Sequence, residues 1–202
     1  MADPRVEILD KTVCYDGFFR MERYRLRHRL FSGAWSRVLT RELFERGHAA
    51  AVLPYDPALD AVVLVEQFRI GALEAPGSPW LLEIVAGIIE PDETPEDVVR
   101  REAVEEANCQ IQDLIHIYDY FVSPGGTSER ISLFCGKVDA AGAGGLGGLA
   151  EEAEDIRVIV VPFAEAIAHM HVGKINSAAP IMALQWLQLN HDQLRVRWGT
   201  DA

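Results

Sequence analysis

Acidic residues gather at fixed spacing in one short segment, residues 86–109, beside a glycine and an arginine. The positions concerned are Gly87, Glu93, Arg101, Glu102, Glu105 and Glu106. On a helix, glutamates three and four residues apart share one edge, where their like charges repel each other. A cation reverses that repulsion, and hard cations such as Mg²⁺ bind carboxylate oxygens and bridge them to phosphate. The segment therefore predicts a metal site that acts on a phosphate substrate.

A helix that begins near Pro95 must hold these carboxylates. Thr94 is a suitable N-cap, Pro95 fits the first helical position, and Asp97 completes an approximate capping box. Apolar residues recur at helical spacing within residues 98–103 and form a separate face. A glutamate-rich helix is more often a solvated surface than a metal site, so the charge run alone would not decide between the two.

The spacing decides in favour of the metal site. Five residues separate Gly87 from Glu93, and seven separate Glu93 from the Arg-Glu pair that begins at Arg101. This pattern resembles the signature of the Nudix hydrolases, Gly-x5-Glu-x7-Arg-Glu-U-x-Glu-Glu-x-Gly-U, at six fixed positions. Asn108 replaces the final glycine, and small residues fill the aliphatic positions. Because asparagine tolerates the left-handed conformation, we expect Asn108 to end the helix as glycine would.

The flanking segments resemble one branch of this family, the enzymes that hydrolyse ADP-ribose. Pro124 stands 15 residues after Cys109, where that branch carries a proline. The likeness continues through TRELFERGHAAAVLPYD (40–56), EQFRIGA (66–72), WLLEIVAG (80–87) and LAEEAEDIRV (149–158). It implies Mg²⁺-dependent hydrolysis, with Mn²⁺ as a substitute, of ADP-ribose to AMP and ribose 5-phosphate. Two alternatives stay open: a hydrolase of another nucleoside diphosphate sugar, and a non-catalytic binding module on the same fold.

The resemblance also implies roles for the acidic residues. The metal would be ligated by the carbonyl of Ala86 and the side chains of Glu102, Glu106 and Glu154. Glu152 would be the general base, and Glu105 would join the metal or orient a water bound to it. Arg101 would pair with Glu93 or another carboxylate of the motif and position the helix, with Gly87 as the remaining structural residue of the motif.

Substrate binding needs positive charge and an aromatic surface. By the same resemblance, Arg41 and Arg69 would contact phosphate and ribose, although a surface salt bridge is the ordinary role of an arginine. Phe18 would stack on adenine. Further contacts with the ligand are expected from Glu83, Ser123 and Glu129. The resemblance implies that two chains share the adenine site in a homodimer with exchanged N-terminal strands.

Composition excludes several other classes of protein. The 202 residues include 19 basic and 31 acidic side chains, a net charge of −12. That charge repels nucleic acids and anionic membranes, so we expect neither as a partner. No stretch is long enough for a transmembrane helix and the N-terminus lacks the apolar core of a signal peptide, so we expect a cytoplasmic protein. The three cysteines, Cys14, Cys109 and Cys135, are expected to be buried and reduced.

The pattern along the chain predicts an α/β protein. Residues 6–31 and 36–47 contain alternating β-prone runs that suggest an antiparallel meander, so we expect residues 1–47 to form a small dimerisation subdomain. Residues 48–202 would form the Nudix domain, an α/β/α sandwich with a mixed sheet. Its strands are expected at 49–56, 61–69, 80–89, 131–139 and 156–163, and two further helices at 163–170 and 179–194. The glycine-rich residues 140–148 lack a phosphate-loop ending and are expected to be a flexible loop that delivers residues 151–155 to the site.

Overall fold

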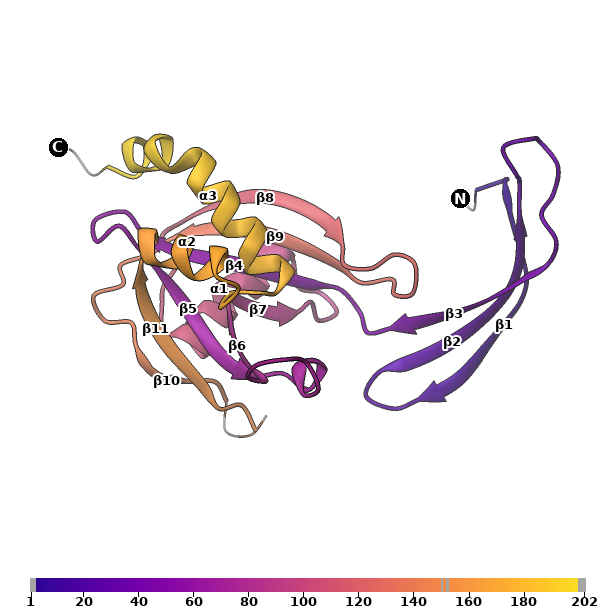
Figure 1. Ribbon diagram of the computed structural model, residues 1–202, viewed down its shortest axis with the longest axis horizontal. Coiled ribbons are helices and arrows are strands. Elements are labelled where there is room, and N and C mark those ends of the chain that lie inside the picture. Colours follow the sequence, from indigo (N-terminus) through magenta and orange to yellow (C-terminus); the bar gives the residue numbers. More distant parts are fainter. Residues whose placement is uncertain (1–2, 150, 152, 200–202) are drawn as a thin grey trace. The chain divides into compact units, whose positions relative to one another are not determined.

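The computed structural model describes residues 3–149, 151 and 153–199. The chain divides into two compact units (Figure 1). The first comprises residues 1–48 and 121–130, and the second comprises residues 49–120 and 131–202. That the segment 121–130 clusters with the N-terminal strands was not foreseen in the sequence.

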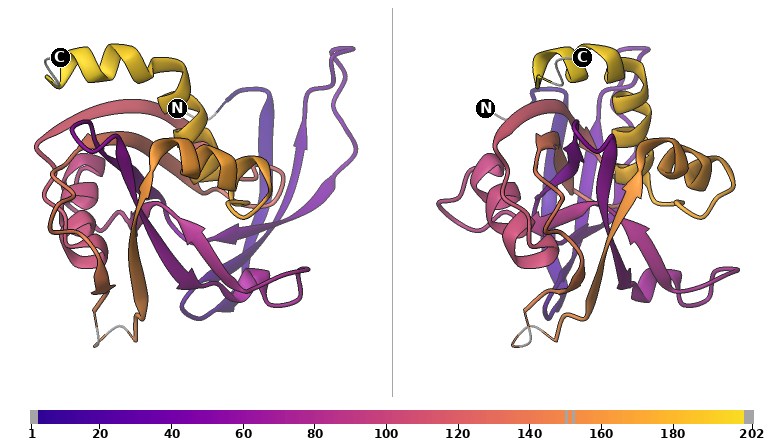
Figure 2. Two further views of the ribbon diagram at one scale, coloured as in Figure 1. Left: turned by 60° about the vertical axis from the view of Figure 1, so that its left-hand side comes forward. Right: turned by 90° about the vertical axis from the view of Figure 1, so that its left-hand side faces the viewer.

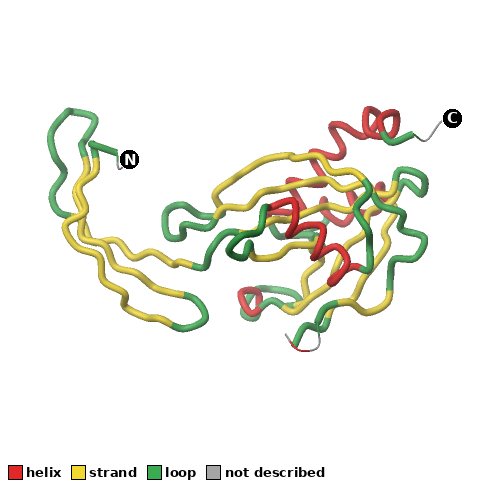
Figure 3. Tube along the Cα trace, turned by 180° about the vertical axis from the view of Figure 1, so that it is seen from behind, coloured by secondary structure: helices red, strands yellow, loops and turns green. Residues whose placement is uncertain are grey.

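The first unit is a three-stranded antiparallel sheet, as the sequence predicted (Figure 3). Its strands, in the order β1-β2-β3, are β1 (Val6–Asp16), β2 (Arg20–His28) and β3 (Leu39–Glu45). Segment 121–130 joins this sheet through the backbone N–H of Phe44, which donates to the carbonyl of Gly126 at 2.8 Å. The described residues of this unit include no helix, and several apolar side chains of β1 are exposed, among them Ile8 and Tyr15. Cys14 is exposed as well, which corrects the expectation that all three cysteines are buried.

The second unit contains an eight-stranded mixed sheet in the order β10-β11-β5-β4-β9-β8, with β6 beside β5 and β7 beside β4. Strands β4 and β9 run parallel, whereas β4 is antiparallel to β5 and β7. The strands are β4 (Ala49–Asp56), β5 (Ala61–Phe68), β6 (Trp80–Glu83), β7 (Val85–Ile88), β8 (Asp113–Phe121), β9 (Arg130–Lys137), β10 (Gly145–Gly147) and β11 (Ile156–Pro162). A short 3₁₀ helix, η1 (Ile70–Ala72), follows β5.

Helices cover both faces of this sheet (Figure 2). The helices are α1 (Pro95–Ala107), α2 (Phe163–His171) and α3 (Ala178–Arg197). Alternate residues of β4 point to opposite faces. Ala50 and Val52 pack with the apolar side of α1, whereas Leu53 and Tyr55 pack with α2 and α3. The second unit is therefore the predicted α/β/α sandwich, with cores on both faces of the sheet.

Helix α1 has the ends that its sequence predicts. The Thr94 side chain accepts a hydrogen bond from the Asp97 N–H at 3.2 Å, and the Asp97 carboxylate accepts one from the Thr94 N–H at 3.1 Å. Pro95 is the first helical residue. Asn108 ends the helix in the left-handed conformation, with φ 52° and ψ 32°. The departure from glycine at this position is therefore accommodated by the backbone.

Three elements differ from expectation. The single strand expected at 80–89 is two strands, β6 and β7, which pair with β5 and β4 respectively. Strand β8 was not predicted, because its sequence DLIHIYDYF mixes polar and apolar residues and most of its side chains are partly or fully exposed at the sheet edge. The glycine-rich residues 140–148 are not simply a loop, because Gly145–Gly147 form β10 and pair with β11. No helix in the described part of the chain is long and apolar enough to cross a membrane.

A partly buried polar network ties α3 to the turn between β4 and β5. Asp60 Oδ1 accepts hydrogen bonds from Tyr55 Oη at 2.8 Å and His191 Nε2 at 2.7 Å. The His191 ring stacks on Phe163, with centroids 4.6 Å apart. Burial opposes ionisation of Asp60, but the hydrogen bonds from His191 and Tyr55 outweigh it and the pKa of Asp60 lies below its ordinary value.

Replacing Asp60 with asparagine should therefore destabilise the fold near neutral pH. The expected loss is only about 1 kcal/mol, because Asp60 is partly exposed and water screens its interaction with His191. Asparagine tolerates the positive φ of 49° at this position, so backbone strain does not confound the comparison. A lowered pKa contributes stability above the ordinary pKa of aspartate and loses it as the pH falls through the folded value. Urea unfolding at pH 7 and pH 3 should show the difference between wild type and variant shrinking at low pH; a constant difference would contradict this account.

Candidate active site

The predicted carboxylates lie along one edge of α1, where Arg101 holds three of them. Arg101 Nε and Nη2 donate to the two oxygens of Glu93 at 3.0 and 3.2 Å. Its Nη1 donates to Glu102 at 2.8 Å and to Glu105 at 3.0 Å. These contacts, with Glu93 first, raise the pKa of Arg101 above its ordinary value. Arg101 therefore pairs with Glu93, as the sequence predicted. Its guanidinium also fixes the positions of the Glu102 and Glu105 carboxylates.

Gly87 is required by the close packing of β7 against α1. A Cβ atom at this position would lie 1.9 Å from Glu102 Oε1. The collision would push the carboxylate away or separate the helix from the strand. The first residue of the motif is thus a glycine because the Glu102 side chain occupies the space that a side chain at position 87 would need.

Glu106 is the most buried carboxylate of the group. Its side chain is 3% exposed, and Oε2 accepts a hydrogen bond from the Ala86 N–H at 3.0 Å. Burial raises the pKa of Glu106 to about 8, and the charges of Glu102 and Glu154 add to that effect. Burial also raises the pKa of Glu102, while Arg101 opposes the rise. Such a cluster of shifted carboxylates is typical of a functional site.

Strand β10 brings the segment that carries Glu154 to the end of α1. A Cβ atom on Gly147 would lie 2.1 Å from the carbonyl oxygen of Glu106, so only glycine allows this approach. The Gly148 N–H donates to the Glu105 carbonyl at 2.8 Å, and Asn108 Nδ2 donates to the carbonyl of Leu146 at 3.3 Å. These contacts were missed in the sequence, where the glycines suggested only flexibility.

Arg69 and Glu83 lie beside this group on the second unit. Arg69 Nε donates to Glu83 Oε2 at 2.6 Å. The charge of Arg69 opposes the rise in the pKa of Glu106, after the larger effects of burial and of the neighbouring glutamates. Of the predicted ligand contacts, these two residues share a unit with the metal motif.

The residues fit a hard divalent cation. Glu102, Glu106 and Glu154 would supply carboxylate oxygens, and Ala86 would supply a carbonyl from the strand that packs against α1. Burial of Glu106 among like charges is a cost that a bound cation would offset. Among the described residues, no three acidic, histidine or cysteine side chains already converge as ligands of one ion. Glu102 instead points to Arg101, so its carboxylate must turn to join the others.

The remaining predicted residues fall elsewhere. Glu152, the predicted general base, lies outside the described residues. Phe18, Arg41, Ser123 and Glu129 belong to the first unit. Ser123 is exposed, whereas Glu129 is buried and pairs with Arg46 at 3.4 Å.

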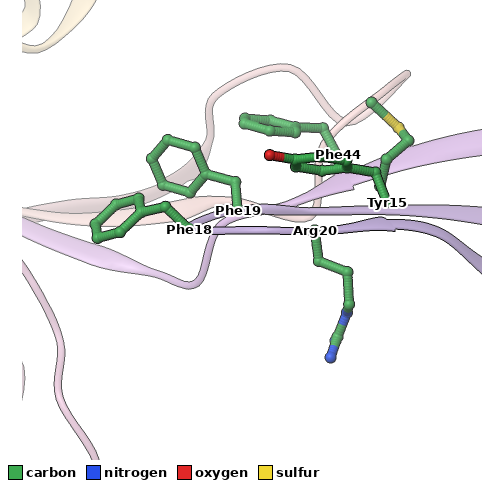
Figure 4. A pocket seen from close by; sticks show the side chains of 6 residues that line it. Tyr15, Phe18, Phe19, Arg20 and Phe44 are labelled. Atoms are coloured by element: carbon green, nitrogen blue, oxygen red, sulfur yellow. The ribbon is translucent and has the colours of Figure 1, made fainter.

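Phe18 lies at the edge of an apolar hollow of about 450 Å³ in the first unit. Its ring is 88% exposed and meets Phe19 edge to face, with centroids 4.7 Å apart. Figure 4 shows the rings of Phe19, Phe44 and Tyr15 on one side of the sheet, with Arg20 pointing to the other. The exposed face of Phe18 leaves room for a planar ligand.

Residues 45–183 match the profile of the NUDIX domain. The chain belongs to the Nudix family. Across 96% of its length, and 93% of the relative, this Nudix protein is 52% identical to the ADP-ribose pyrophosphatase of Escherichia coli strain K12. It is 36% identical to the GDP-mannose pyrophosphatase of Pectobacterium atrosepticum, over 92% of this chain and 94% of the relative. Nudix hydrolases generally use divalent metal ions, which agrees with the carboxylate group described above.

A solved structure supports the fold. The crystal structure of an ADP compounds hydrolase superimposes on this Nudix protein with a TM-score of 0.72, covering 96% of this chain and 99% of that one. The two sequences are only 20% identical, so the likeness concerns the fold alone.

Proposed function

We propose that this Nudix protein hydrolyses the pyrophosphate of ADP-ribose to AMP and ribose 5-phosphate, with Mg²⁺ as the ion and Mn²⁺ as a substitute. The observation that carries the chemistry is the buried carboxylate of Glu106 beside Glu102 and Glu154. The choice of ADP-ribose is supported by the similarity to the Escherichia coli enzyme over nearly the whole chain.

The metal site would be formed by the carbonyl of Ala86 and the side chains of Glu102, Glu106 and Glu154. A divalent ion bound there would neutralise phosphate charge and lower the pKa of a bound water. Gly87 leaves room for Glu102, and Arg101 holds the helix edge while Glu105 orients water near the site. Two features support these roles: Arg101 bonds Glu102 and Glu105, and the missing side chain at Gly87 leaves space for Glu102.

Glu152 would take the proton from the attacking water. As the oxygen of that water bonds to one phosphorus, the bond between this phosphorus and the bridging oxygen breaks. AMP leaves with one phosphate and ribose 5-phosphate with the other. Arg69, held by Glu83 beside the carboxylates, would bind the phosphate oxygens and keep the pyrophosphate oriented.

The first unit would supply recognition of the nucleoside. Phe18 presents a free aromatic face for adenine, Arg41 would contact phosphate or ribose, and Ser123 and Glu129 would hydrogen-bond the ligand. We propose that residues 1–47 form the dimerisation subdomain and residues 48–202 the catalytic domain, and that two chains with exchanged N-terminal strands complete the adenine site. In support, apolar side chains of β1 are 42–65% exposed, among them Val6, Ile8, Val13 and Tyr15.

Turnover of a substrate panel tests the proposal. With Mg²⁺, the purified protein should show its highest kcat/KM for ADP-ribose and release AMP, compared with ADP-glucose, GDP-mannose, NADH and diadenosine polyphosphates. EDTA should abolish the activity. Preference for GDP-mannose would show that the proposed substrate is wrong and would leave the proposed metal chemistry intact. GDP-mannose is included because the Pectobacterium relative is a GDP-mannose pyrophosphatase. Absence of turnover with every substrate would contradict the enzymatic function.

A further inference from the structure

Arg46 contacts two segments of the first unit that are distant in sequence. It follows directly after β3. Its Nε lies 3.4 Å from Glu129 Oε1, on the segment 121–130. The same guanidinium lies over the ring of Phe19, in the turn between β1 and β2, with its Cζ 5.1 Å from the ring centroid. One cation therefore holds both a carboxylate and an aromatic ring.

Both contacts lead to residues that are proposed to bind the ligand. Phe19 meets Phe18 edge to face, with centroids 4.7 Å apart, and Phe18 is the ring proposed to stack on adenine (Figure 4). Phe19 also meets Phe44 edge to face at 5.2 Å, so Phe19 is held from two sides. Glu129 is 7% exposed. Because a carboxylate can accept several hydrogen bonds, its pairing with Arg46 leaves Glu129 able to accept one from a ligand hydroxyl.

Attachment of the segment 121–130 to β3 does not explain an arginine at position 46. The backbone makes that attachment, because the Phe44 N–H donates to the Gly126 carbonyl at 2.8 Å and Thr127 pairs with Phe44 in a parallel bridge. The buried Nε of Arg46 has no hydrogen-bond partner among the described residues, so at 3.4 Å it acts on Glu129 through charge. The guanidinium thus orients the Glu129 carboxylate and leaves its oxygens available.

We propose that Arg46 is a positioning residue for ligand binding, which fixes the Glu129 carboxylate and, through Phe19, the ring of Phe18. A cation restrains an aromatic ring over which it lies and a carboxylate beside which it lies. The inference rests on the proposed function, because it takes Phe18 and Glu129 as contacts with ADP-ribose. It adds a residue that acts through both of these contacts and links them to each other.

Replacing Arg46 with methionine keeps much of the side chain's length and removes the cation. The Kd of the full-length protein for ADP-ribose, titrated calorimetrically in EDTA so that no turnover occurs, should rise about tenfold, the effect of one lost hydrogen bond to a charged group. KM in Mg²⁺ should rise with it, whereas kcat should stay within about twofold of wild type. In a Glu129→Gln background, Arg46→Met should raise the Kd much less, because part of its effect passes through that carboxylate.

Arg27→Met is the matched control for a purely structural role. Arg27 also pairs with a glutamate, Glu7, at 2.6 Å and lies over an aromatic ring, Trp35, at 4.9 Å. Its side chain is 39% exposed, against 37% for Arg46. Because neither Glu7 nor Trp35 is a proposed ligand contact, Arg27→Met should leave the Kd, KM and kcat at their wild-type values.

Arg46→Lys covers the case in which Arg46→Met does not fold, since removal of the cation leaves Glu129 buried without a counter-charge. Lysine keeps the charge but loses the flat guanidinium over Phe19, so the Kd of Arg46→Lys should rise about threefold. A wild-type Kd in Arg46→Lys would then overturn the inference by itself.

Three further results would overturn the inference: a wild-type Kd and KM in folded Arg46→Met, equal losses of affinity in Arg46→Met and Arg27→Met, or full additivity of Arg46→Met with Glu129→Gln. The wild-type protein tests the proposed function separately. If wild type neither binds nor hydrolyses ADP-ribose, the proposed function fails and the inference fails with it. If wild type hydrolyses ADP-ribose and Arg46→Met has the same KM, the inference alone fails.

Discussion

Replacing Glu106 with glutamine should lower turnover on the order of a thousandfold, since a metal ligand contributes several kcal/mol of charge stabilisation to the transition state. The same change should stabilise the protein in the absence of metal. Glu106 is 3% exposed among like charges, and glutamine has nearly the same shape without a charge. Activity and stability should thus move in opposite directions, as expected where a fold retains an unfavourable group for function.

The raised pKa of Glu106 determines how the difference in stability between wild type and Glu106→Gln changes with pH. The pKa of Glu106 is raised to about 8 in the folded protein. Its contribution to stability is fully present below the ordinary pKa of glutamate and is lost as the pH rises through the folded value. In EDTA, the variant should be more stable than wild type at pH 8 by a few kcal/mol, and the two should converge near pH 4.

Thermal unfolding in EDTA across this pH range checks the predicted gain in stability. Measurement of kcat/KM in Mg²⁺ checks the predicted loss of activity. Glu96→Gln is a matched control, because Glu96 is an exposed glutamate on the first turn of the same helix. It should change neither quantity by more than a small amount. A variant at Glu106 that loses stability at pH 8 would show that its carboxylate is satisfied by the protein alone.

Replacing Glu152 with glutamine should lower kcat by roughly a hundredfold or more, the range expected for loss of a general base. KM and the affinity for Mn²⁺ should change little, because the amide keeps the size of the side chain and Glu152 is not proposed as a ligand. By contrast, Arg69→Ala should act chiefly by raising KM.

The neighbouring glutamate provides the control for this assignment. Glu151→Gln should leave kcat near the wild-type value. If Glu151→Gln loses kcat and Glu152→Gln does not, the base has been assigned to the wrong one of two adjacent residues. Single-turnover measurements are preferable to steady-state ones here, because they isolate the chemical step from product release.

Local signals explain which parts of the fold were predictable. Thr94, Pro95 and Asp97 specify the start of α1, and Asn108 its end, through contacts within a few residues. The nearly continuous apolar runs of β4 and β5 likewise follow from burial on both faces of the sheet. The pairing of Arg101 with Glu93 was expected from the family pattern, and it forms within a single segment.

The features that were missed depend on contacts distant in sequence. The exposure of Cys14 was missed because alternation along β1 does not reveal whether other parts of the chain cover the strand. Gly145–Gly147 became a strand because β11 lies alongside, and a glycine-rich composition carries no sign of that partner.

The approach of Gly147 to the last turn of α1 has a bearing on how such enzymes diversify. The backbone at Gly147 and Gly148 is fastened to the helix that carries Glu102 and Glu106. The residues between Gly148 and Glu154 can therefore be exchanged without moving that helix, while Gly147 itself must stay small. Evolution can in this way change the segment that carries the general base while the metal ligands stay the same. The position of the base and the binding of the ion can then change independently of each other.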